Sequence, residues 1–260
     1  DNILKQVHTD YIRAGSQIIT TNTYASSRIM LKSAGFEKRF EEVNLKAVNS
    51  ALKAREETGY KDVIIAGSIS HRYPIADGDT KSNASIQVSK LELQEATEEM
   101  ALLLTNNGCD IILLEMMYRP ERMKIIFDIV KKLNIPIWVC FSCRKSDKGE
   151  ILSLTDETVV PFSEMIAISK EYNFGAWGIM HTSEDILGEC IKMIKANFNG
   201  PILSYPDTGG WISPNWIFDS VIEPEKFKEK ANGWFALGAQ IIGGCCGTSP
   251  DHIRALATLK

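Results

Sequence analysis

The sequence lacks the features of a membrane or secreted protein. No apolar run comes near the roughly 20 residues that a membrane-spanning helix needs. The first residues, 1–5, read DNILK and carry no apolar segment of the signal-peptide kind. The formal net charge is −4 with both signs scattered, so no basic face for nucleic acid is predicted. We therefore expect a cytoplasmic protein that binds neither membranes nor nucleic acids.

Histidine is scarce in this chain, whereas cysteine is not. The 260 residues include four histidines and six cysteines. Without a secretory signal, six cysteines indicate a reducing compartment, where they serve as core residues, metal ligands or nucleophiles rather than as disulfides. Hydrophobic residues make up 44% and charged residues 24%, which is typical of a globular protein and argues against disorder.

Short apolar runs rich in Ile and Val recur along the chain, and they show no alternation of polar and apolar residues. Such runs are typical of parallel strands that are buried on both faces. The seven runs are residues 17–21, 63–68, 110–115, 135–141, 176–180, 201–205 and 240–243. Stretches with helical spacing lie between them, for example residues 121–133 and 163–171. In the stretch 91–106, Leu93, Ala96, Met100 and Leu103 form one apolar stripe.

Strands and helices alternate over the whole chain, which predicts a parallel α/β sheet. An open sheet accommodates seven strands, whereas a closed barrel of this length normally has eight. An amphipathic helix at residues 3–14 precedes the first predicted strand. We interpret residues 1–260 as a single (β/α)8 TIM-barrel domain that lacks its first strand, because the chain is truncated or the strand comes from elsewhere. The irregular segments 71–84, 142–156 and 207–216 follow strands, so we expect them on the catalytic face.

The segment 243–248, Gly-Gly-Cys-Cys-Gly-Thr, closes the last predicted strand. Adjacent cysteines in a straight strand point to opposite faces and cannot share a ligand. Flanking glycines permit positive φ angles that turn both thiols toward one point. Two thiolates at one strand end favour a soft divalent metal, of which zinc is the first candidate. The alternative is that Cys245 and Cys246 are buried and act as small hydrophobic residues.

A catalytic zinc keeps three protein ligands and one open position, so a third ligand is needed. His181 directly follows the predicted strand 176–180 and fits this role. Cys143, just past the strand that ends at residue 141, is the competing candidate. We interpret the remaining cysteines as structural. They are Cys109, Cys140 and Cys190.

These residues belong to a series of segments by which the sequence resembles the homocysteine S-methyltransferase family over essentially its whole length. The matching segments, in order, are His8-Thr9-Asp10-Tyr11-Ile12 with Ala14-Gly15, Thr21-Asn22-Thr23-Tyr24, Ala66-Gly67-Ser68, Leu114-Glu115, Tyr205-Pro206-Asp207-Thr208-Gly209, and Gly243 to Thr248 followed by Ser249-Pro250. The last segment is the most specific of them. The resemblance implies a (β/α)8 barrel, in agreement with the strand pattern.

The resemblance also implies a zinc ion bound by three cysteines, with the sulfur of homocysteine as its fourth ligand. Cys245 and Cys246 match two of these cysteines, whereas the family's Gly-Val-Asn-Cys segment here ends in His181. A His-Cys-Cys site would be less negative than a three-cysteine site. We expect it to bind the substrate thiol more tightly and to slow the alkylation step. The competing hypothesis is that metal affinity is lost. The family's Asp-Gly-Gly segment, which helps to bind homocysteine, is absent.

Further residues are candidates for substrate binding. Glu115 matches a family glutamate that pairs with the substrate ammonium, although it could instead satisfy backbone N–H groups at a helix start. The other candidates are Asn22, Tyr24, Ser68 and Asp207. Tyr24, Trp211 and Trp216 could offer aromatic faces to a cationic methyl donor, or could simply be packing residues.

These observations predict a zinc-dependent thiol methyltransferase that converts homocysteine to methionine. The expected donor is a small onium compound, such as S-methylmethionine, a betaine or a related sulfonium. One alternative is a non-catalytic or altered zinc- or thiol-binding relative. Another is a methyltransferase subunit that uses a corrinoid partner. The expected partners are homocysteine and the donor, and an oligomer is compatible with the sequence.

Overall fold

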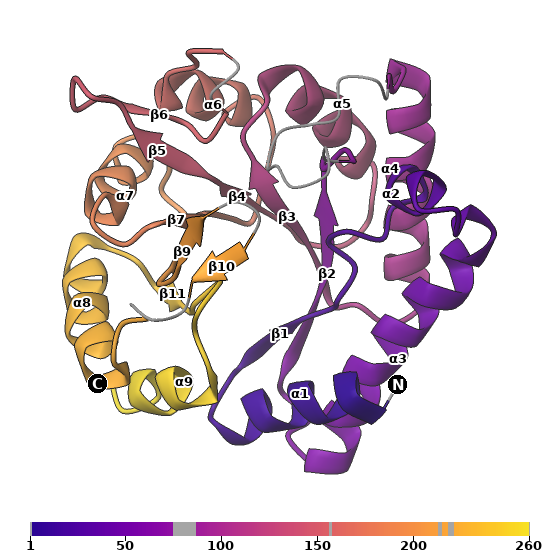
Figure 1. The fold of residues 1–260 in the computed structure, drawn as a ribbon, viewed down its shortest axis with the longest axis horizontal. Coiled ribbons are helices and arrows are strands. Elements are labelled where there is room, and N and C mark those ends of the chain that lie inside the picture. The colour runs from indigo at the N-terminus through magenta and orange to yellow at the C-terminus, as the bar shows by residue number, and fades with distance from the viewer. Residues whose placement is uncertain (1, 75–86, 156–157, 213–214, 218–220, 260) are drawn as a thin grey trace. The chain divides into compact units, whose positions relative to one another are not determined.

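A computed structural model describes residues 2–74, 87–155, 158–212, 215–217 and 221–259. The chain packs as two compact units. Unit 1 comprises residues 1–115, 125–137 and 212–215, and unit 2 comprises residues 116–124, 138–211 and 216–260. Each unit is built around parallel strands that alternate with helices along the chain (Figure 1).

Three parallel strands form the centre of unit 1. They are β1 (Ile18–Thr20), β2 (Ile64–Ser70) and β3 (Ile111–Met117). β2 pairs with β1 on one side and with β3 on the other, with Thr20 opposite Ala66 and Ser68 opposite Leu113. Every residue of β3 is buried, as expected of a strand covered on both faces.

The helices of unit 1 pack around these strands. They are α1 (Asn2–Arg13), α2 (Arg28–Ser33), the short 3-10 helix η1 (Glu37–Arg39), α3 (Phe40–Thr58) and α4 (Lys90–Asn106). α1 packs against α3, while α3 and α4 both contact β2 (Figure 1). A capping box starts α4, because the side chains of Ser89 and Glu92 each accept a hydrogen bond from the other residue's backbone N–H. Gly59 ends α3 in the left-handed conformation.

Unit 2 contains four parallel strands. They are β4 (Ile137–Phe141), β7 (Ala176–Ser183), β8 (Ile202–Asp207) and β11 (Ile241–Ile242). β7 lies between β4 and β8, and β11 pairs with the other edge of β8. The hairpin of β5 (Cys143–Lys145) and β6 (Ile151–Ser153) follows β4. The pair β9 (Gly210–Ile212) and β10 (Asn215–Ile217) follows β8.

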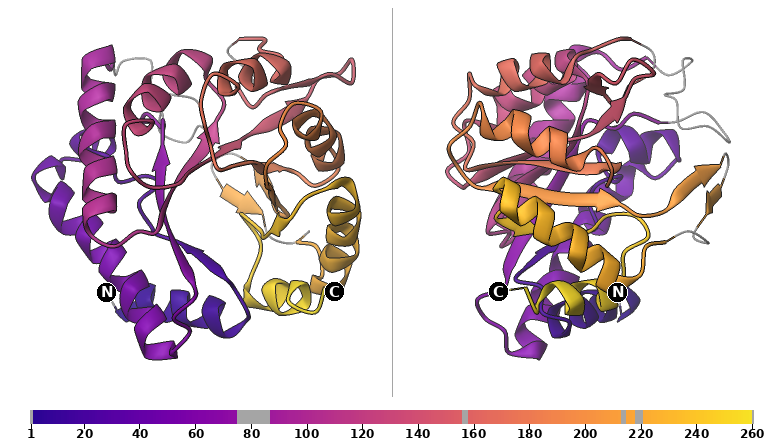
Figure 2. Two further views of the ribbon diagram at one scale, coloured as in Figure 1. Left: turned by 180° about the vertical axis from the view of Figure 1, so that it is seen from behind. Right: turned by 90° about the vertical axis from the view of Figure 1, so that its left-hand side faces the viewer.

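The helices after β6 are α6 (Phe162–Ser169), α7 (Leu187–Lys195), α8 (Pro224–Leu237) and α9 (Pro250–Leu256), while α5 (Pro120–Val130) follows β3. α7 packs on β7 and β8, α8 packs on α7, and α9 packs on α8. Both views of Figure 2 show this succession from orange to yellow. The buried indole of Trp177 stacks on Phe198 at a centroid distance of 4.6 Å and meets Phe141 edge-on.

The structure confirms all seven predicted parallel strands and the four predicted helices named above, with ends shifted by a few residues. Two of the three segments expected to be irregular contain the small sheets β5–β6 and β9–β10. In α4 the stripe continues to the fully buried Leu104 rather than to Leu103. Among the described residues, no helix is long and apolar enough to cross a membrane. The interpretation of residues 1–260 as one domain stays a prediction.

Candidate metal centre

A β-bulge at the end of β7 places His181. β7 and β8 pair Met180 with Tyr205, and then pair Ser183 with Asp207, so β7 carries one extra residue between the two pairs. His181 lies in this bulge with a φ of 42°, one of two positive φ angles outside glycine among the described residues. Histidine tolerates this left-handed conformation better than a β-branched residue would. Strained backbone of this kind is concentrated at functional sites.

The two adjacent cysteines are held against the end of β8 by backbone hydrogen bonds. The N–H of Cys245 donates to the carbonyl of Pro206 at 2.9 Å, and the N–H of Thr208 donates to the carbonyl of Cys246 at 3.0 Å. The hydroxyl of Thr208 also lies 3.5 Å from the carbonyl oxygen of Cys246. The segment after β11 therefore runs beside β8, and it brings both thiols next to Asp207.

Glycine is required at two points around this turn. Gly247 has a φ of +84°, and a Cβ there would lie 2.7 Å from the hydroxyl of Thr208. Gly244 does not have a positive φ, but a Cβ there would lie 2.2 Å from the methyl group of Thr248. The expectation that positive φ angles converge the thiols therefore applies to Gly247, whereas Gly244 is required for close packing.

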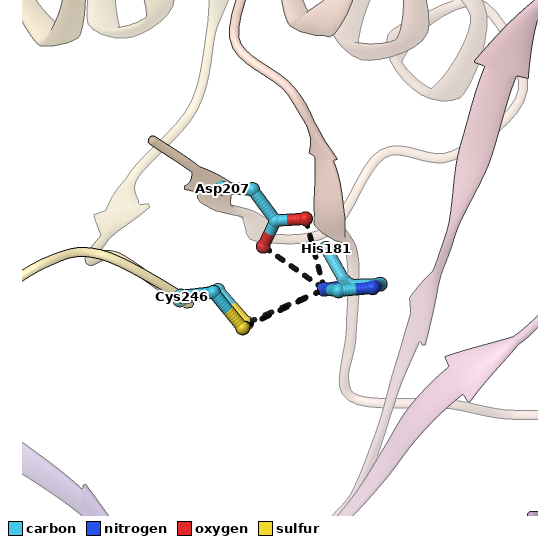
Figure 3. A group of neighbouring side chains, drawn as sticks. His181, Asp207 and Cys246 are labelled. Atoms are coloured by element: carbon cyan, nitrogen blue, oxygen red, sulfur yellow. Dashed lines mark hydrogen bonds and ion pairs between the residues drawn. The ribbon is translucent and has the colours of Figure 1, made fainter. Parts of the chain in front are cut away.

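Four side chains converge at this point: His181, Asp207, Cys245 and Cys246. Figure 3 shows how His181, Asp207 and Cys246 point toward one another. The Nδ1 atom of His181 lies 2.9 Å from both carboxylate oxygens of Asp207. The same atom lies 4.0 Å from the sulfur of Cys245 and 3.9 Å from that of Cys246. The two sulfur atoms are 3.9 Å apart. One donor atom from each of the four residues lies within 4.8 Å of the others.

The side chains of this cluster shift one another's pKa values toward the charged forms. Burial opposes protonation of His181, but hydrogen bonds to Asp207 and Cys246 outweigh it and raise the pKa of the imidazole to about 9. A hydrogen bond from Cys245 lowers the pKa of Cys246, and contact with His181 adds to this against the effect of burial, giving a pKa of about 6. Without a metal, these shifts favour a thiolate at Cys246 and an imidazolium at His181 at neutral pH.

The donor set fits a borderline divalent metal. Two thiolates, an imidazole and a carboxylate are all ligands that zinc accepts. With zinc–sulfur bonds of about 2.3 Å in a tetrahedral site, two thiolate sulfurs lie about 3.8 Å apart, and the sulfurs of Cys245 and Cys246 are 3.9 Å apart. Binding would require loss of the proton from Nδ1 of His181, because this nitrogen faces both sulfurs.

The structure brings together the three residues expected to bind metal, His181, Cys245 and Cys246. The sequence argument did not place Asp207 in this group, although Asp207 closely follows the predicted strand 201–205, just as His181 follows the predicted strand 176–180, and this was a usable signal. Cys143 is not part of the cluster and is buried against Cys190. Burial and this neighbour raise the pKa of Cys143 well above its usual value, which suits a structural thiol.

A second polar group lies within unit 1. Ser68 is fully buried and donates a hydrogen bond to the carboxylate of Glu115, which is 8% exposed. The buried hydroxyls of Thr21 and Thr23 lie 2.8 Å apart beside the backbone of Ser68. Of the predicted substrate residues, Glu115 and Ser68 thus contact each other directly.

The remaining candidates lie in different surroundings. Asn22 is exposed, and Tyr24 is partly buried beneath the guanidinium of Arg72, which lies 5.8 Å from the ring centroid. Tyr24 and Arg72 also line a small pocket beside β2 and α4. The side chains of Trp211 and Trp216 lie outside the described part of the structure, so the aromatic cage stays a prediction.

Comparison with known proteins assigns the chain to a family. The family model for homocysteine S-methyltransferase matches residues 1–259. The chain belongs to the homocysteine S-methyltransferase family. This confirms the resemblance inferred from the sequence motifs, together with the prediction of an enzyme of this family.

Relatives of known name agree with this assignment. Homocysteine S-methyltransferase 1 of Arabidopsis thaliana is 25% identical over 98% of this chain and 82% of its own length. Homocysteine S-methyltransferase 2 of Zea mays is 28% identical over 98% of this chain and 79% of its own length. Selenocysteine methyltransferase of Astragalus bisulcatus is 25% identical over 98% of this chain and 81% of its own length.

A solved structure shows the same fold. The metallated form of the homocysteine methyltransferase MmuM from Escherichia coli matches with a TM-score of 0.77 and 23% identity. The match covers 97% of this chain and 83% of that protein. The predicted α/β barrel class is therefore confirmed.

Proposed function

We propose that this protein transfers a methyl group from a small onium donor to the thiol of homocysteine, giving methionine, with the help of zinc. Membership of the homocysteine S-methyltransferase family supports the thiol acceptor. The observation that supports a metal ion is the convergence of His181, which lies in β7, with Cys245 and Cys246, which follow β11. Zinc would be held by these three residues, and when bound it supplies Lewis acidity that keeps a substrate thiol deprotonated.

The chain's own residues would prepare the site for this chemistry. Asp207 accepts the Nδ1 proton of His181 in the metal-free cluster, and so orients the imidazole toward the two sulfurs. Zinc held by Nδ1 would take the place of this proton, and the carboxylate would then act as a nearby negative charge. The hydrogen bonds of Cys245 and Cys246 to β8 fix the thiol pair before metal arrives. Such preorganisation reduces the entropy lost on binding. We assign Glu115 as the acceptor for the ammonium group of homocysteine.

Asp207 also changes the charge expected at the site. Two thiolates and a neutral imidazole carry one negative charge fewer than three thiolates. The carboxylate of Asp207, 2.9 Å from His181, adds that charge back. The His181–Asp207 pair together therefore carries the charge of a third thiolate. The tighter thiol binding and slower alkylation expected for a His-Cys-Cys site should consequently be moderated as long as Asp207 is present.

For the methyl donor, we propose a chemical class rather than a single compound. A cationic methyl donor, such as S-methylmethionine, a betaine or a related sulfonium, needs no further cofactor to activate its methyl group. Positioning of donor and thiolate in line would then account for much of the catalysis. No acid–base pair is needed for the transfer once the acceptor is a thiolate.

The first experiment is elemental analysis of the reduced, purified protein with and without homocysteine. We expect close to one zinc ion per chain, retained better when homocysteine is present. Wild-type protein that holds no zinc under either condition would contradict the proposal and would favour a non-catalytic relative.

An activity assay then distinguishes among the candidate methyl donors. Methionine formation should be assayed with S-methylmethionine, glycine betaine and dimethylsulfoniopropionate, each at the same concentration. Turnover with one of them and homocysteine supports the proposed reaction. Zinc-loaded protein that is inactive with all three, but copurifies with a protein showing corrinoid absorbance, would favour a methyltransferase subunit instead.

A further inference from the structure

One side chain connects the two positive φ angles that the described residues show outside glycine. Met116, near the end of β3, has a φ of 51°, and His181, in the bulge of β7, has a φ of 42°. Backbone of this kind persists only where the surrounding structure holds it in place. The connecting residue is Met180, which directly precedes His181 and whose sulfur contacts the backbone of Met116. All three residues belong to unit 2.

The sulfur of Met180 accepts two hydrogen bonds. The backbone N–H of Met116 donates to it at 3.1 Å, and the hydroxyl of Tyr205 donates to it at 3.4 Å. A methionine side chain has three rotatable bonds and readily adapts to its surroundings, and its thioether is a weak acceptor. Two donors on one sulfur therefore fix the end of an otherwise adaptable side chain. They also join β7 to the ends of β3 and β8.

The backbone on both sides of His181 is held by buried hydroxyl groups. The carbonyl oxygen of Met180 accepts from the hydroxyl of Ser142 at 3.0 Å and from that of Thr182 at 2.7 Å. Because Thr182 uses its only proton there, its oxygen accepts from the N–H of Cys143, at 3.0 Å. Met180 is 4% exposed and Thr182 is 2% exposed. Both neighbours of His181 are therefore fixed in the interior of unit 2.

The partners of His181 itself are the other members of the candidate metal centre. Its Nδ1 atom lies beside the carboxylate of Asp207 and the sulfurs of Cys245 and Cys246. Bonds from a metal to its ligands tolerate deviations of only about 0.2 Å, so the backbone that carries a ligand has to be fixed. The contacts of Met180 supply such a fixed point one residue before His181.

We propose that Met180 is a positioning residue whose thioether ties the bulge of β7 to the ends of β3 and β8, and so sets His181 in the place from which it binds the metal. This inference rests on the proposed function, because it assigns His181 as a ligand. Met180 itself is not a ligand in this proposal. Its effect on the metal is transmitted through the backbone of the bulge.

Cobalt binding tests this role in the reduced, metal-free protein. Co²⁺ alone stands in for zinc, and its visible absorption depends on the number and kind of its ligands. Met180→Leu removes the acceptor and nearly conserves the volume of the side chain. We expect it to weaken cobalt binding roughly tenfold, as for loss of an outer-shell partner. The spectrum of bound cobalt should shift toward that of His181→Ala, because the histidine is displaced.

Two further variants separate positioning from a loss of stability. Met165→Leu is the matched control, because Met165 is fully buried in α6 of unit 2 and its sulfur takes part in no hydrogen bond within the described part of the chain. It should leave cobalt affinity and spectrum unchanged. Tyr205→Phe removes one donor to the sulfur and leaves Met180 in place. It should shift affinity and spectrum in the direction of Met180→Leu, but by less.

The outcomes distinguish this inference from the proposed function. Weaker binding with a shifted spectrum in Met180→Leu, next to an unchanged Met165→Leu, supports the positioning role. A folded Met180→Leu protein with the wild-type cobalt spectrum overturns it, even where its urea midpoint is lowered, while the metal site stands. If Met180→Leu does not fold, a wild-type spectrum in Tyr205→Phe overturns the inference instead. Wild-type protein that binds no cobalt contradicts the proposed metal site itself.

Discussion

At the scale of single residues, His181 sets the chemistry of the cluster. Its positive φ and its place in a bulge aim Nδ1 at Asp207 and at both sulfurs. A cysteine in the same place would supply a third thiolate without needing Asp207. We therefore propose that the residue pair, rather than either residue alone, sets the charge and the metal affinity of the candidate site.

The role of His181 can be tested by two substitutions. We expect His181→Ala to lower zinc affinity by more than the roughly 10- to 100-fold that loss of an outer-shell partner costs, because a direct ligand is removed. His181→Cys should keep stoichiometric zinc, since it restores a thiolate. The measurement is competition with a chromophoric chelator. Unchanged affinity in His181→Ala would show that the histidine is not a ligand.

Asp207 should matter through its charge. Asp207→Asn keeps the shape of the side chain but removes the negative charge beside His181. We expect zinc affinity to fall by roughly tenfold, and the same substitution should have a smaller effect in a His181→Cys background. A double-mutant cycle of zinc affinities measures this coupling. Additive effects of the two substitutions would contradict the proposal that the pair acts as one charged unit.

The thiols should differ in reactivity when zinc is removed. The pKa of Cys246 is lowered to about 6, so it is mostly thiolate at neutral pH. Burial, with a smaller contribution from Asp110, raises the pKa of Cys109 to about 12, so it stays a thiol. We expect iodoacetamide to label Cys246 at pH 7, at a rate that falls as pH drops through about 6, and to leave Cys109 unmodified. Peptide mass spectrometry reads both sites, and preferential labelling of Cys109 would contradict this.

At the scale of elements, the candidate metal centre depends on how β7, β8 and the turn after β11 lie beside one another. The bulge in β7 and the hydrogen bonds from Cys245 and Thr208 are backbone features. Gly247 permits the turn because its φ of +84° and the nearby Thr208 leave no place for a side chain. A backbone change here should therefore affect the site even though it removes no ligand.

Gly247→Ala tests this dependence. We expect a loss of about 1–3 kcal/mol in the free energy of unfolding, because alanine is strained at positive φ, together with weaker zinc binding. The matched control is Gly233→Ala, which lies at an exposed position inside α8 with nothing within 4 Å of the added Cβ. The control should gain roughly 0.5–1 kcal/mol. Chemical denaturation measures both, and normal zinc binding by Gly247→Ala would show that the turn tolerates a side chain.

At the scale of the whole molecule, a metal that binds only the folded chain must stabilise it by mass action. The cluster joins β7, β8 and the segment after β11, which are distant in the sequence, so an unfolded chain cannot form it. Zinc in excess of its dissociation constant should therefore raise the melting temperature of the wild-type protein. Differential scanning calorimetry with zinc or with a chelator should show this shift, and His181→Ala should abolish it. An equal shift in the variant would mean that zinc binds elsewhere.

Much of the architecture could be predicted from the sequence, because a parallel strand buried on both faces leaves a continuous apolar run. All seven such runs are strands, and the helical spacing between them marks helices. The short sheets β5–β6 and β9–β10 escaped prediction because their three-residue strands lie in the segments 142–156 and 207–216, where polar residues and glycine predominate and no Ile- and Val-rich run marks a strand. The segment 243–248 likewise pointed to Cys245 and Cys246 as candidate ligands, since two cysteines flanked by glycines form a local pattern.

Only the tertiary structure determines which side chains from distant parts of the sequence come into contact. The sequence left His181 and Cys143 as competing ligands, and only the bulge in β7 and the packing of Cys143 against Cys190 separate them. Strand register brings Asp207 to the candidate metal cluster and Ser68 to Glu115, and in both cases the hydrogen-bonded residues are far apart in the chain. The physical reason is that residue types and spacing determine which chemistry a chain carries, whereas the distances that determine pKa, charge balance and proton direction arise only when strands pair.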